Sequence, residues 1–208
     1  MAHRRLHAEV SRRRFLAASL ASAGAAWTPN LFAAGPKPKV AAVVTEFTYR
    51  SHAHVILENF LEPYLFNGEI VEPEFEIASM YIDQFPSNDM GRDVGKQYNI
   101  PIHPTIGQAL TLGRDKLAVD AVLSIGEHGS YPMTPLGQQM YPRKRFFDEI
   151  VAVFEQSRRS APVFNDKHLS YRWDWAREMY DASLRLGFGL MAGSSVPLAQ
   201  RQIGRAHV

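Results

Sequence analysis

Short apolar runs alternate with longer segments of helical periodicity between residues 37 and 194, and this alternation constrains the fold more than any other feature. Compact apolar runs lie at residues 40–45, 75–82, 100–103, 118–125, 162–164 and 188–192. Segments with apolar residues three or four apart separate them, at 51–61, 89–98, 105–112, 145–156 and 171–186. Strands separated by helices form parallel β-α-β units. The sequence therefore predicts an α/β domain with a doubly wound, Rossmann-like parallel sheet of five or six strands.

The periodicity also predicts which faces of two helices are buried. Ser51 is a candidate cap for the first helix, which ends before Pro63. Its expected inward residues are Val55, Ile56, Phe60 and Leu61, and those of the helix at 145–156 are Phe146, Phe147, Ile150, Val151 and Phe154.

Polar residues cluster where the predicted strands end. They occupy residues 45–54, 83–84, 126–129, 165–168 and 193–195, and they include four histidines, Lys167 and four carboxylates. Ligands of doubly wound sheets bind outside the carboxyl ends of the strands. We therefore expect a ligand site at this edge, with residues 129–142, which hold Tyr131, Tyr141 and three prolines, as a rigid lid or an interaction surface.

The charge distribution argues against nucleic-acid binding. The chain carries 23 basic and 21 acidic residues, but five of the basic and one of the acidic residues precede residue 35. The 18 basic and 20 acidic residues that remain make the body mildly acidic, whereas a nucleic-acid-binding domain is typically basic. We therefore expect a small-molecule ligand. A homo-oligomer, in which the partner is a second copy of the chain, is left open.

Residues 1–34 resemble a twin-arginine export signal. Residues 11–16 read Ser-Arg-Arg-Arg-Phe-Leu, and a short run of small apolar residues follows. We expect the translocation machinery to be a partner and the protein to be periplasmic or otherwise extracytoplasmic. The alternatives are a basic amphipathic helix and a single membrane anchor, for which the apolar run is short.

Residues 202–208 have an unusual origin in our interpretation. The hexapeptide at 203–208, Ile-Gly-Arg-Ala-His-Val, is what one reading frame of a common short-read sequencing adapter encodes. We expect the native chain to continue beyond residue 201, and the alternative is a natural basic tail. The domain proper is then residues 35–201.

Several segments together resemble the glucose–fructose oxidoreductase and inositol dehydrogenase (Gfo/Idh/MocA) family. The segment 163–169, followed by a helix and by residues 190–193, is similar to the Glu-Lys-Pro region of that family. Residues 120–125 look like its fourth strand, and residues 98–110 like its "Tyr-Gly-x-Pro, Leu-rich helix" run. The resemblance covers residues 38–197 and implies a Rossmann domain that binds NAD or NADP, with a second, α+β substrate domain beyond residue 201.

The resemblance also implies roles for individual residues. Lys167 takes the place beside the nicotinamide and the sugar hydroxyl, and His168 is a candidate catalytic residue next to it. Asp83 falls where the family holds the adenosine ribose, although it could instead cap the loop before Pro86. The remaining candidate cofactor-binding residues are Thr45, Arg50, His52, Gly126, Glu127 and Asp166.

The turn after the first strand departs from the family pattern. Residues 45–52 contain no glycine, although glycines normally let the backbone approach the pyrophosphate. Arg50 and His52 are the side chains expected to bind the phosphates instead, and His54 is expected to be an ordinary helix-cap residue. Lys167 could likewise be a surface lysine paired with Asp166.

Three functions remain open on the sequence alone. The first is an exported oxidoreductase that moves a hydride between a nicotinamide cofactor and a sugar or polyol. The second is a non-redox carbohydrate-binding module on the same fold. The third is a metal-assisted lyase or hydrolase, in which Glu127, His128, Asp166 and His168 bind a divalent metal.

Overall fold

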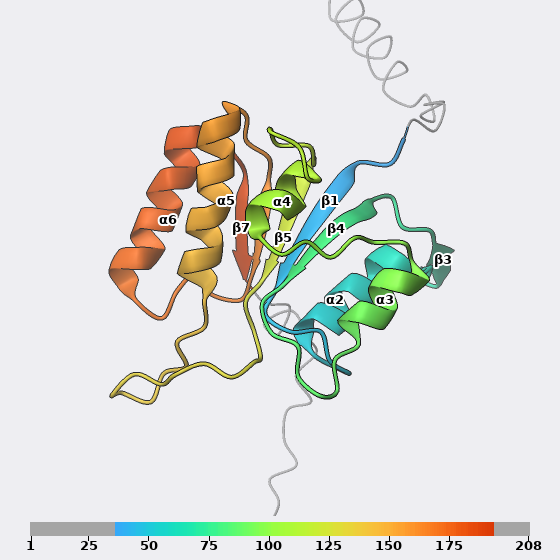
Figure 1. Ribbon diagram of the computed structural model, residues 1–208, viewed down its shortest axis with the longest axis horizontal. Helices are drawn as coiled ribbons and strands as arrows, with labels where there is room; N and C mark the ends of the chain where they lie inside the picture. Colours follow the sequence, from blue (N-terminus) through green and yellow to red (C-terminus); the bar gives the residue numbers. More distant parts are fainter. Residues whose placement is uncertain (1–35, 194–208) are drawn as a thin grey trace, which may run out of the picture. The chain divides into compact units, whose positions relative to one another are not determined.

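A five-stranded parallel sheet lies at the centre of the computed structural model, which describes residues 36–193 (Figure 1). The strands β1 (Lys39–Val44), β4 (Glu76–Ile82), β5 (Ala121–Ile125), β6 (Val163–Asp166) and β7 (Leu190–Gly193) lie in the order β4-β1-β5-β6-β7. β1 pairs in parallel with both β4 and β5. The predicted α/β fold class is therefore confirmed. The predicted export signal at 1–34 and adapter-encoded tail at 202–208 lie outside the described residues.

The sheet has the strand order of a Rossmann domain. The strand predicted at residues 100–103 is reduced to one parallel bridge, between Ile102 and Met80 of β4. Backbone hydrogen bonds from Met80 N to Pro101 O (2.9 Å) and from His103 N to Met80 O (2.8 Å) flank it. With this residue counted as the third strand, the order is 3-2-1-4-5-6. The direction of the strand order changes between β1 and β5, so the switch point lies there.

Helices cover both faces of the sheet. α2 (His52–Leu61) and α3 (Gly91–Gln97) pack on one face, and α4 (Ile106–Thr111), α5 (Arg143–Ser157) and α6 (Trp173–Leu186) pack on the other. Side chains of a strand alternate between its faces. Ala41 and Val43 accordingly join the core under α4, α5 and α6, whereas Val40, Ala42 and Val44 join the core under α2 and α3.

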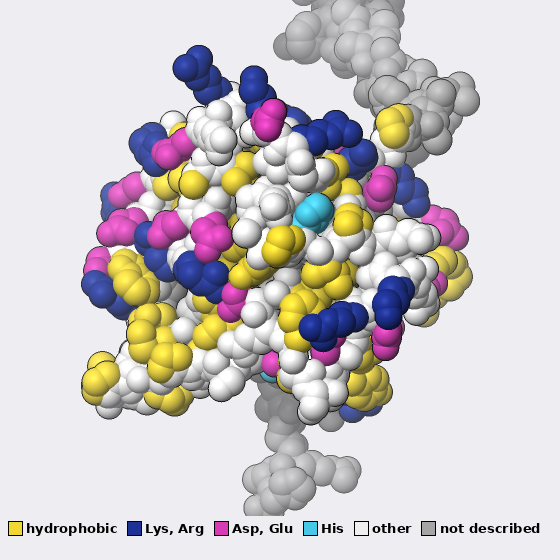
Figure 2. Space-filling view, viewed as in Figure 1, with side chains coloured by type: hydrophobic (Ala, Val, Ile, Leu, Met, Phe, Trp, Pro, Cys, Tyr) yellow, Lys and Arg dark blue, Asp and Glu magenta, His cyan; other side chains and the backbone are white. Residues whose placement is uncertain are grey.

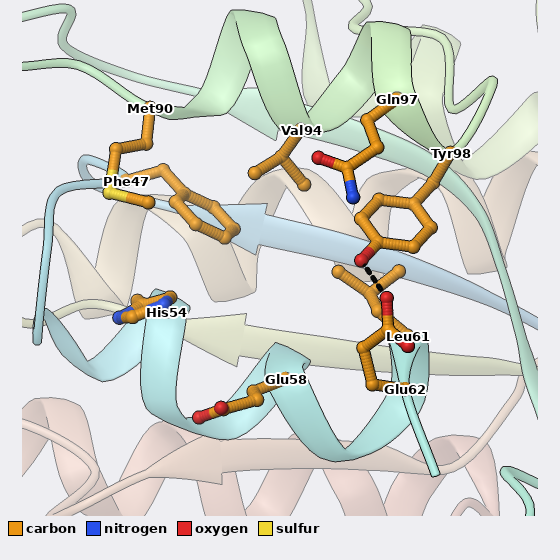
Figure 3. A pocket seen from close by; sticks show the side chains of 9 residues that line it. All are labelled: Phe47, His54, Glu58, Leu61, Glu62, Met90, Val94, Gln97 and Tyr98. Carbon is orange, nitrogen blue, oxygen red and sulfur yellow. Dashed lines mark hydrogen bonds between the residues drawn. The ribbon is translucent and has the colours of Figure 1, made fainter.

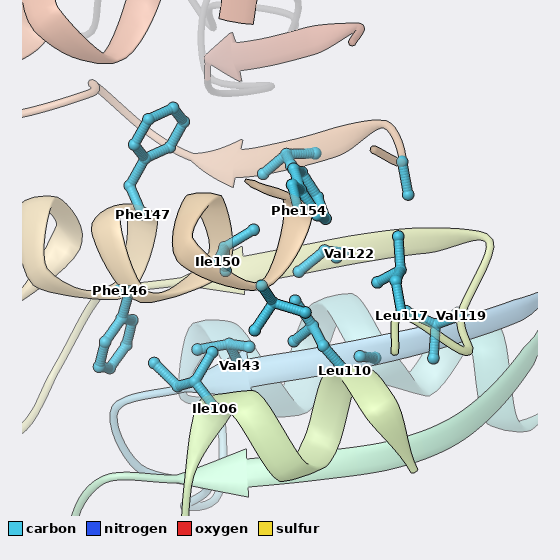
Figure 4. Close-up of a cluster of buried hydrophobic side chains, with 14 of the residues drawn as sticks. Val43, Ile106, Leu110, Leu117, Val119, Val122, Phe146, Phe147, Ile150 and Phe154 are labelled. Carbon is cyan, nitrogen blue, oxygen red and sulfur yellow. The ribbon is translucent and has the colours of Figure 1, made fainter. Parts of the chain in front are cut away.

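The larger core contains the inward face of α5 (Figure 4). Phe146, Phe147, Ile150 and Phe154 are buried there, as the helical spacing predicts, while Val151 is only partly buried. Phe154 also meets the ring of Phe188, with centroids 5.2 Å apart. The first turn of α5 lies next to the end of β5, where Arg143 approaches Gly126.

The buried face of α2 differs from the prediction. Ser51 caps the helix as expected, and its side chain accepts a hydrogen bond from His54 N. Ala53 and Leu57 are the fully buried residues, whereas Val55 is 51% exposed. The prediction for Val55 was wrong because the helix directs residues 53 and 57, four apart, against the sheet; Ile56, Phe60 and Leu61 lie partly buried at its margin.

A small antiparallel hairpin follows α2 and was not predicted. β2 (Tyr64–Phe66) pairs with β3 (Glu69–Val71) across Asn67 and Gly68. Both turn residues have positive φ, at 51° and 88°. An Asn-Gly pair in this conformation is typical of a two-residue hairpin turn.

Charges of both signs are interspersed on the surface formed by α5 and α6 (Figure 2). Several are paired along or between these helices, as in Arg177–Asp181 and Arg185–Glu155. This face carries no single-sign patch, in agreement with the mildly acidic composition. Within residues 36–193, none of the helices combines the length and the apolar character that a bilayer span requires.

Candidate functional site

The predicted ligand edge lies where β1 and β5 end side by side. Thr45 follows β1 and is fully buried; its N–H donates to Ile125 O (3.2 Å), and its hydroxyl donates to the carbonyl of Glu127. Gln84 N, after β4, donates to Thr45 O (2.8 Å). Thr45 therefore joins the three strand ends to one another, so its side chain serves the structure rather than facing a ligand.

The turn between β1 and α2 satisfies its own polar groups. The hydroxyl of Ser51 is buried and accepts from Thr48 N (3.1 Å) and His54 N (3.3 Å), while Ser51 N donates to Thr48 O (3.0 Å). Arg50 has a positive φ of 62°, and its N–H donates to His54 Nδ1 (3.0 Å). The N–H groups of residues 48, 50, 51 and 54 thus bond within the turn. The side chain of Arg50 is exposed, with its guanidinium 5.1 Å from the centroid of the Tyr49 ring.

Phe47 occupies the middle of this turn, where a glycine is usual. Its side chain is buried in the core under α2 and α3, and its carbonyl accepts from Met90 N (2.8 Å). A groove of about 210 Å³ lies between α2 and α3, and Phe47 and His54 are among the residues that line it (Figure 3). At the other end of the groove, Tyr98 donates to Glu62. His54 therefore lines this groove, and Ser51 rather than His54 is the N-cap of α2.

Asp83 is held by three protein donors. Its carboxylate accepts from Tyr81 Oη (2.6 Å), Tyr131 Oη (2.7 Å) and Arg145 (2.5 Å). Burial opposes ionisation of this carboxyl, but these three hydrogen bonds outweigh it and lower the pKa of Asp83. Burial raises the pKa of Tyr131, and its hydrogen bond to Asp83 raises it further. A carboxylate accepts about four hydrogen bonds, so little capacity remains for a ribose diol.

The bonds of Asp83 anchor the loop at 129–142. Gln84 adds two more bonds to this loop, from its Nε2 to Ser130 O (3.0 Å) and to its Oε1 from Ser130 N (2.9 Å). Tyr131 packs edge-on against Tyr141, with centroids 5.9 Å apart. The loop is therefore fastened to the end of β4, and its predicted role as a lid or an interaction surface stays a prediction.

A buried ion pair stands at the end of β5. The side chain of Arg143, in the first turn of α5, is 1% exposed and pairs with Glu127, whose side chain is 15% exposed. A Cβ at Gly126 would lie only 2.7 Å from Cγ of Arg143. Gly126 thus permits the close approach of the arginine. The predicted site residues Gly126 and Glu127 therefore position Arg143.

Arg143 also faces His168. Its NH1 atom lies 3.4 Å from Nε2 of His168. Burial lowers the pKa of His168 and the neighbouring Arg143 lowers it further, against the opposing effect of Glu127. The imidazole is therefore neutral near pH 7, and its Nε2 is suited to accept a hydrogen bond from the guanidinium. Burial likewise lowers the pKa of Arg143, while Glu127 and Asp166 counteract this effect.

The second cluster contains His52, Asp166 and His128. Nδ1 of His52 lies 2.5 Å from Oδ2 of Asp166, and the ring of His128 packs edge-on against His52 at a centroid distance of 5.0 Å. Lys167 follows Asp166 with a positive φ of 67°, and its N–H donates to Gly193 O (2.9 Å). Lys167 is partly exposed, and among the described residues no ion pair joins it to Asp166, so the expected surface pair is not observed.

Four buried polar atoms at these strand ends have no hydrogen-bond partner within residues 36–193; one is Oγ of Ser124 in β5. The other three lie in the strand-end clusters. They are Nε2 of His128, Nε of Arg143 and Oδ1 of Asn165. Asn165 is otherwise engaged, since its Nδ2 donates to the carbonyls of Asp166 (3.3 Å) and His168 (3.1 Å). Buried polar groups are rarely left unpaired, and exceptions call for an explanation such as a bound ligand or water.

The metal hypothesis is not supported. Among the described residues, no group of three or more His, Cys, Asp or Glu side chains is arranged to bind a metal ion. Glu127 is committed to Arg143, and Asp166 to His52. His168 faces a guanidinium, and His128 packs edge-on against His52. The four proposed ligands thus lie on one edge without sharing a coordination centre.

Four residues that organise this edge were not predicted as site residues. Tyr81, Tyr131 and Arg145 bond Asp83, and Arg143 faces His168. Arg143 could have been found from its spacing. It precedes Phe146, Phe147 and Ile150 by three, four and seven positions, so it lies on the buried stripe of the same helix. A charged residue on such a stripe requires a buried partner.

No family model matches the chain, and no curated protein matches it. Solved structures do match. A dehydrogenase from Clostridium difficile is 13% identical, with a TM-score of 0.46, over 75% of this chain and 39% of its own. A Gfo/Idh/MocA family oxidoreductase from Vibrio cholerae is 15% identical, with a TM-score of 0.48, over 76% of this chain and 38% of its own. GenD2 from gentamicin A biosynthesis, in complex with NAD, is 14% identical, with a TM-score of 0.49, over 80% of this chain and 37% of its own.

The chain therefore spans less than two fifths of the length of these three matched structures. At such low identities a structural likeness concerns the fold alone. The fold itself rests on the observed strand order.

Proposed function

We propose that the chain is a divergent member of the Gfo/Idh/MocA family and acts as an exported oxidoreductase on a sugar or polyol, with NAD or NADP as cofactor. The observation that carries the proposal is the gathering of His52, Asp166 and Arg143 at the switch point of a Rossmann-ordered sheet. Ligands of such sheets bind at this point. Export rests on the arginine-rich residues 11–16.

The first turn does not fit the pyrophosphate as a glycine-rich turn would. Phe47 fills the turn with a buried ring, and the N–H groups of Thr48, Arg50 and Ser51 bond within it. A dinucleotide would therefore have to be bound by side chains. Arg50 is the exposed guanidinium of this turn, and it could form charge-assisted bonds with the phosphates.

The ends of β5 and β6 fit a polyhydroxylated ligand. Arg143 pairs with Glu127 there, and Asp166 contacts Nδ1 of His52. The neutral imidazole of His168 and the amide of Asn165 add groups that both donate and accept. By the resemblance, the ammonium of Lys167 would donate to the reacting hydroxyl and His168 would lie beside it.

A second candidate function is a carbohydrate-binding module without redox activity. The closed first turn favours it, because that turn would need no nucleotide to satisfy its polar groups. The sugar site at the ends of β5 and β6 is common to both candidates. They differ only in whether a dinucleotide binds.

Calorimetric titration of the protein with NAD, NADP and a panel of sugars and polyols tests the proposal. For the oxidoreductase we expect nucleotide binding that Arg50→Ala weakens about tenfold or more, because a charge-assisted hydrogen bond contributes about 1.5–3 kcal/mol. Arg158→Ala is the matched control, since Arg158 is also exposed with a positive φ but lies at the C-terminus of α5.

The outcomes separate the two candidates. Nucleotide binding that both variants leave unchanged would refute the role of Arg50 but keep the oxidoreductase. Sugar binding without any nucleotide binding would favour the carbohydrate-binding module. Absence of both would refute the proposed function.

A further inference from the structure

The contact between His52 and Asp166 joins two segments that are 114 positions apart in the chain. Nδ1 of His52 lies 2.5 Å from Oδ2 of Asp166. The side chain of Asp166 is 7% exposed, whereas that of His52 is 28% exposed. One partner is thus held inside the protein, and the other reaches the surface of the ligand edge.

The sheet order brings the pair together. His52 begins α2 after β1, Asp166 ends β6, and β5 lies between these two strands. Neighbouring strands are about 4.8 Å apart, so His52 must reach across the end of β5 to contact Asp166. His128, in the loop that follows β5, lies against the imidazole of His52 from this intermediate position.

We infer that His52 and Asp166 form a proton-transfer dyad, in which Asp166 holds the Nδ1–H of His52 and the Nε2 of His52 exchanges a proton with a hydroxyl of the bound ligand. The identity of that ligand as a sugar or polyol rests on the proposed function. His52 is then a catalytic residue and Asp166 a positioning residue. This assignment replaces the expected role of His52 as a phosphate-binding residue.

The geometry fits this chemistry. A carboxylate at Nδ1 selects the tautomer with an unprotonated Nε2 and orients the ring, as in other carboxylate–imidazole pairs. In the proton-transfer step, the ligand O–H bond breaks and an Nε2–H bond forms. The imidazolium that results lies beside the Asp166 carboxylate, which stabilises its charge. The reverse step returns the proton.

Nε2 is the ring nitrogen of His52 left for proton transfer, because Nδ1 contacts Asp166. His128 presents its ring to His52 and has a buried Nε2 without a partner among residues 36–193. Arg143 and Glu127 neutralise one another at the end of β5. A ligand hydroxyl at this edge would therefore find the Nε2 of His52 as the acid–base group, on the same edge as the Arg143–Glu127 pair.

Nitrogen-detected NMR of the histidine side chains in the full chain tests the dyad. The ¹⁵N shifts of an imidazole distinguish its two neutral tautomers, and His52→Gln assigns the signals. We expect the Nδ1–H tautomer in the wild-type protein, its loss in Asp166→Asn and its recovery in Asp166→Glu. His54→Gln is the matched control, because His54 lies on the same helix but faces the groove between α2 and α3.

Addition of myo-inositol or glucose then probes the ligand side. We expect the polyol to shift the Nε2 signal of His52, and His52→Gln to weaken its binding about tenfold, with His54→Gln unchanged. Thermal melting of each variant shows whether it is folded. The tautomer itself is measured on the wild-type protein, and only the assignment of the signals depends on a variant, His52→Gln.

The failures are distinguishable. An Nε2–H tautomer of His52 in the wild-type protein would overturn the dyad whatever binds. Polyol binding that leaves Nε2 unshifted would overturn the dyad and keep the proposed function. Absence of any response to polyols or sugars would overturn the proposed substrate class and, with it, the ligand of the dyad.

Discussion

In the turn between β1 and α2 the polar groups bond one another, whereas at the ends of β5 and β6 four buried polar atoms lack a partner within the described residues. Both regions lie on the carboxyl edge of the same sheet. The turn is built around Ser51 and filled by Phe47. The strand-end cluster is built around Arg143 and Asp166, two buried charges.

The difference concerns how much each region can still bind. A turn that satisfies its own N–H groups is complete without an anion, although glycine-rich turns at this place leave those groups for phosphates. Buried polar atoms without a protein partner can bond a ligand hydroxyl or a water. This contrast supports the proposal of a ligand at the ends of β5 and β6.

We expect the largest effect on stability when the charge of Glu127 is removed. Glu127→Gln leaves the buried guanidinium of Arg143 without a counter-charge. Breaking one side of a buried ion pair costs about 3–5 kcal/mol, so we expect a loss of that size in the free energy of unfolding, measured with urea. Glu149→Gln is the control, because the Arg145–Glu149 pair is exposed and contributes at most about 1 kcal/mol. Equal effects of the two variants would contradict the buried role of Arg143.

A smaller effect is expected when the first turn is opened. Ser51→Ala removes the acceptor of two N–H groups, those of Thr48 and His54. Loss of a helix N-cap costs about 1–2 kcal/mol, and we expect this decrease in urea denaturation. Thr105→Ala, which removes the cap of α4, is the control with a similar cost. Faster hydrogen exchange at residues 48–54 in the Ser51 variant alone would confirm that the turn is closed by Ser51, and unchanged exchange would contradict it.

The sequence predicted the fold better than the site. Alternating apolar runs were enough for the strands, because a buried parallel strand must be apolar on both faces, as β1 is. The strand ends were also predicted, since composition changes abruptly at residues 45, 126 and 165. The reduced third strand and the hairpin at 64–71 were not, because their length depends on pairing with neighbours rather than on local pattern.

Pairings between side chains were beyond the sequence. His52, Glu127 and Asp166 were all candidates, but each was expected to face a cofactor, whereas Glu127 and Asp166 face protein partners. Which side chains meet at an edge depends on strand order and on loop conformation, as in the positive φ of His128 and Lys167. The spacing of residues in the sequence indicates neither the strand order nor the loop conformation. Arg143 is the exception, because its place on a buried helical stripe is visible in the sequence.

The smallest expected effect concerns Asp83 and acid stability. Three hydrogen bonds lower its pKa against the effect of burial, so the folded state holds the carboxylate more strongly than the unfolded state does. Such a group stabilises the fold above its unfolded pKa of about 4, and this stabilisation is lost as the pH falls through the folded pKa. Asp83→Asn should therefore flatten the decrease in the free energy of unfolding between about pH 5 and pH 2.

Tyr131→Phe is the graded form of the same experiment. It removes one of the three donors to Asp83 and keeps the ring that packs against Tyr141. We expect a loss of about 1 kcal/mol at neutral pH and an acid slope between those of the wild-type protein and Asp83→Asn, because two donors still hold the carboxylate. Urea midpoints across the same pH range give both quantities. A wild-type slope in Asp83→Asn would contradict this prediction. It would show that the carboxylate fastens the loop at 129–142 without contributing to the acid dependence of the free energy of unfolding.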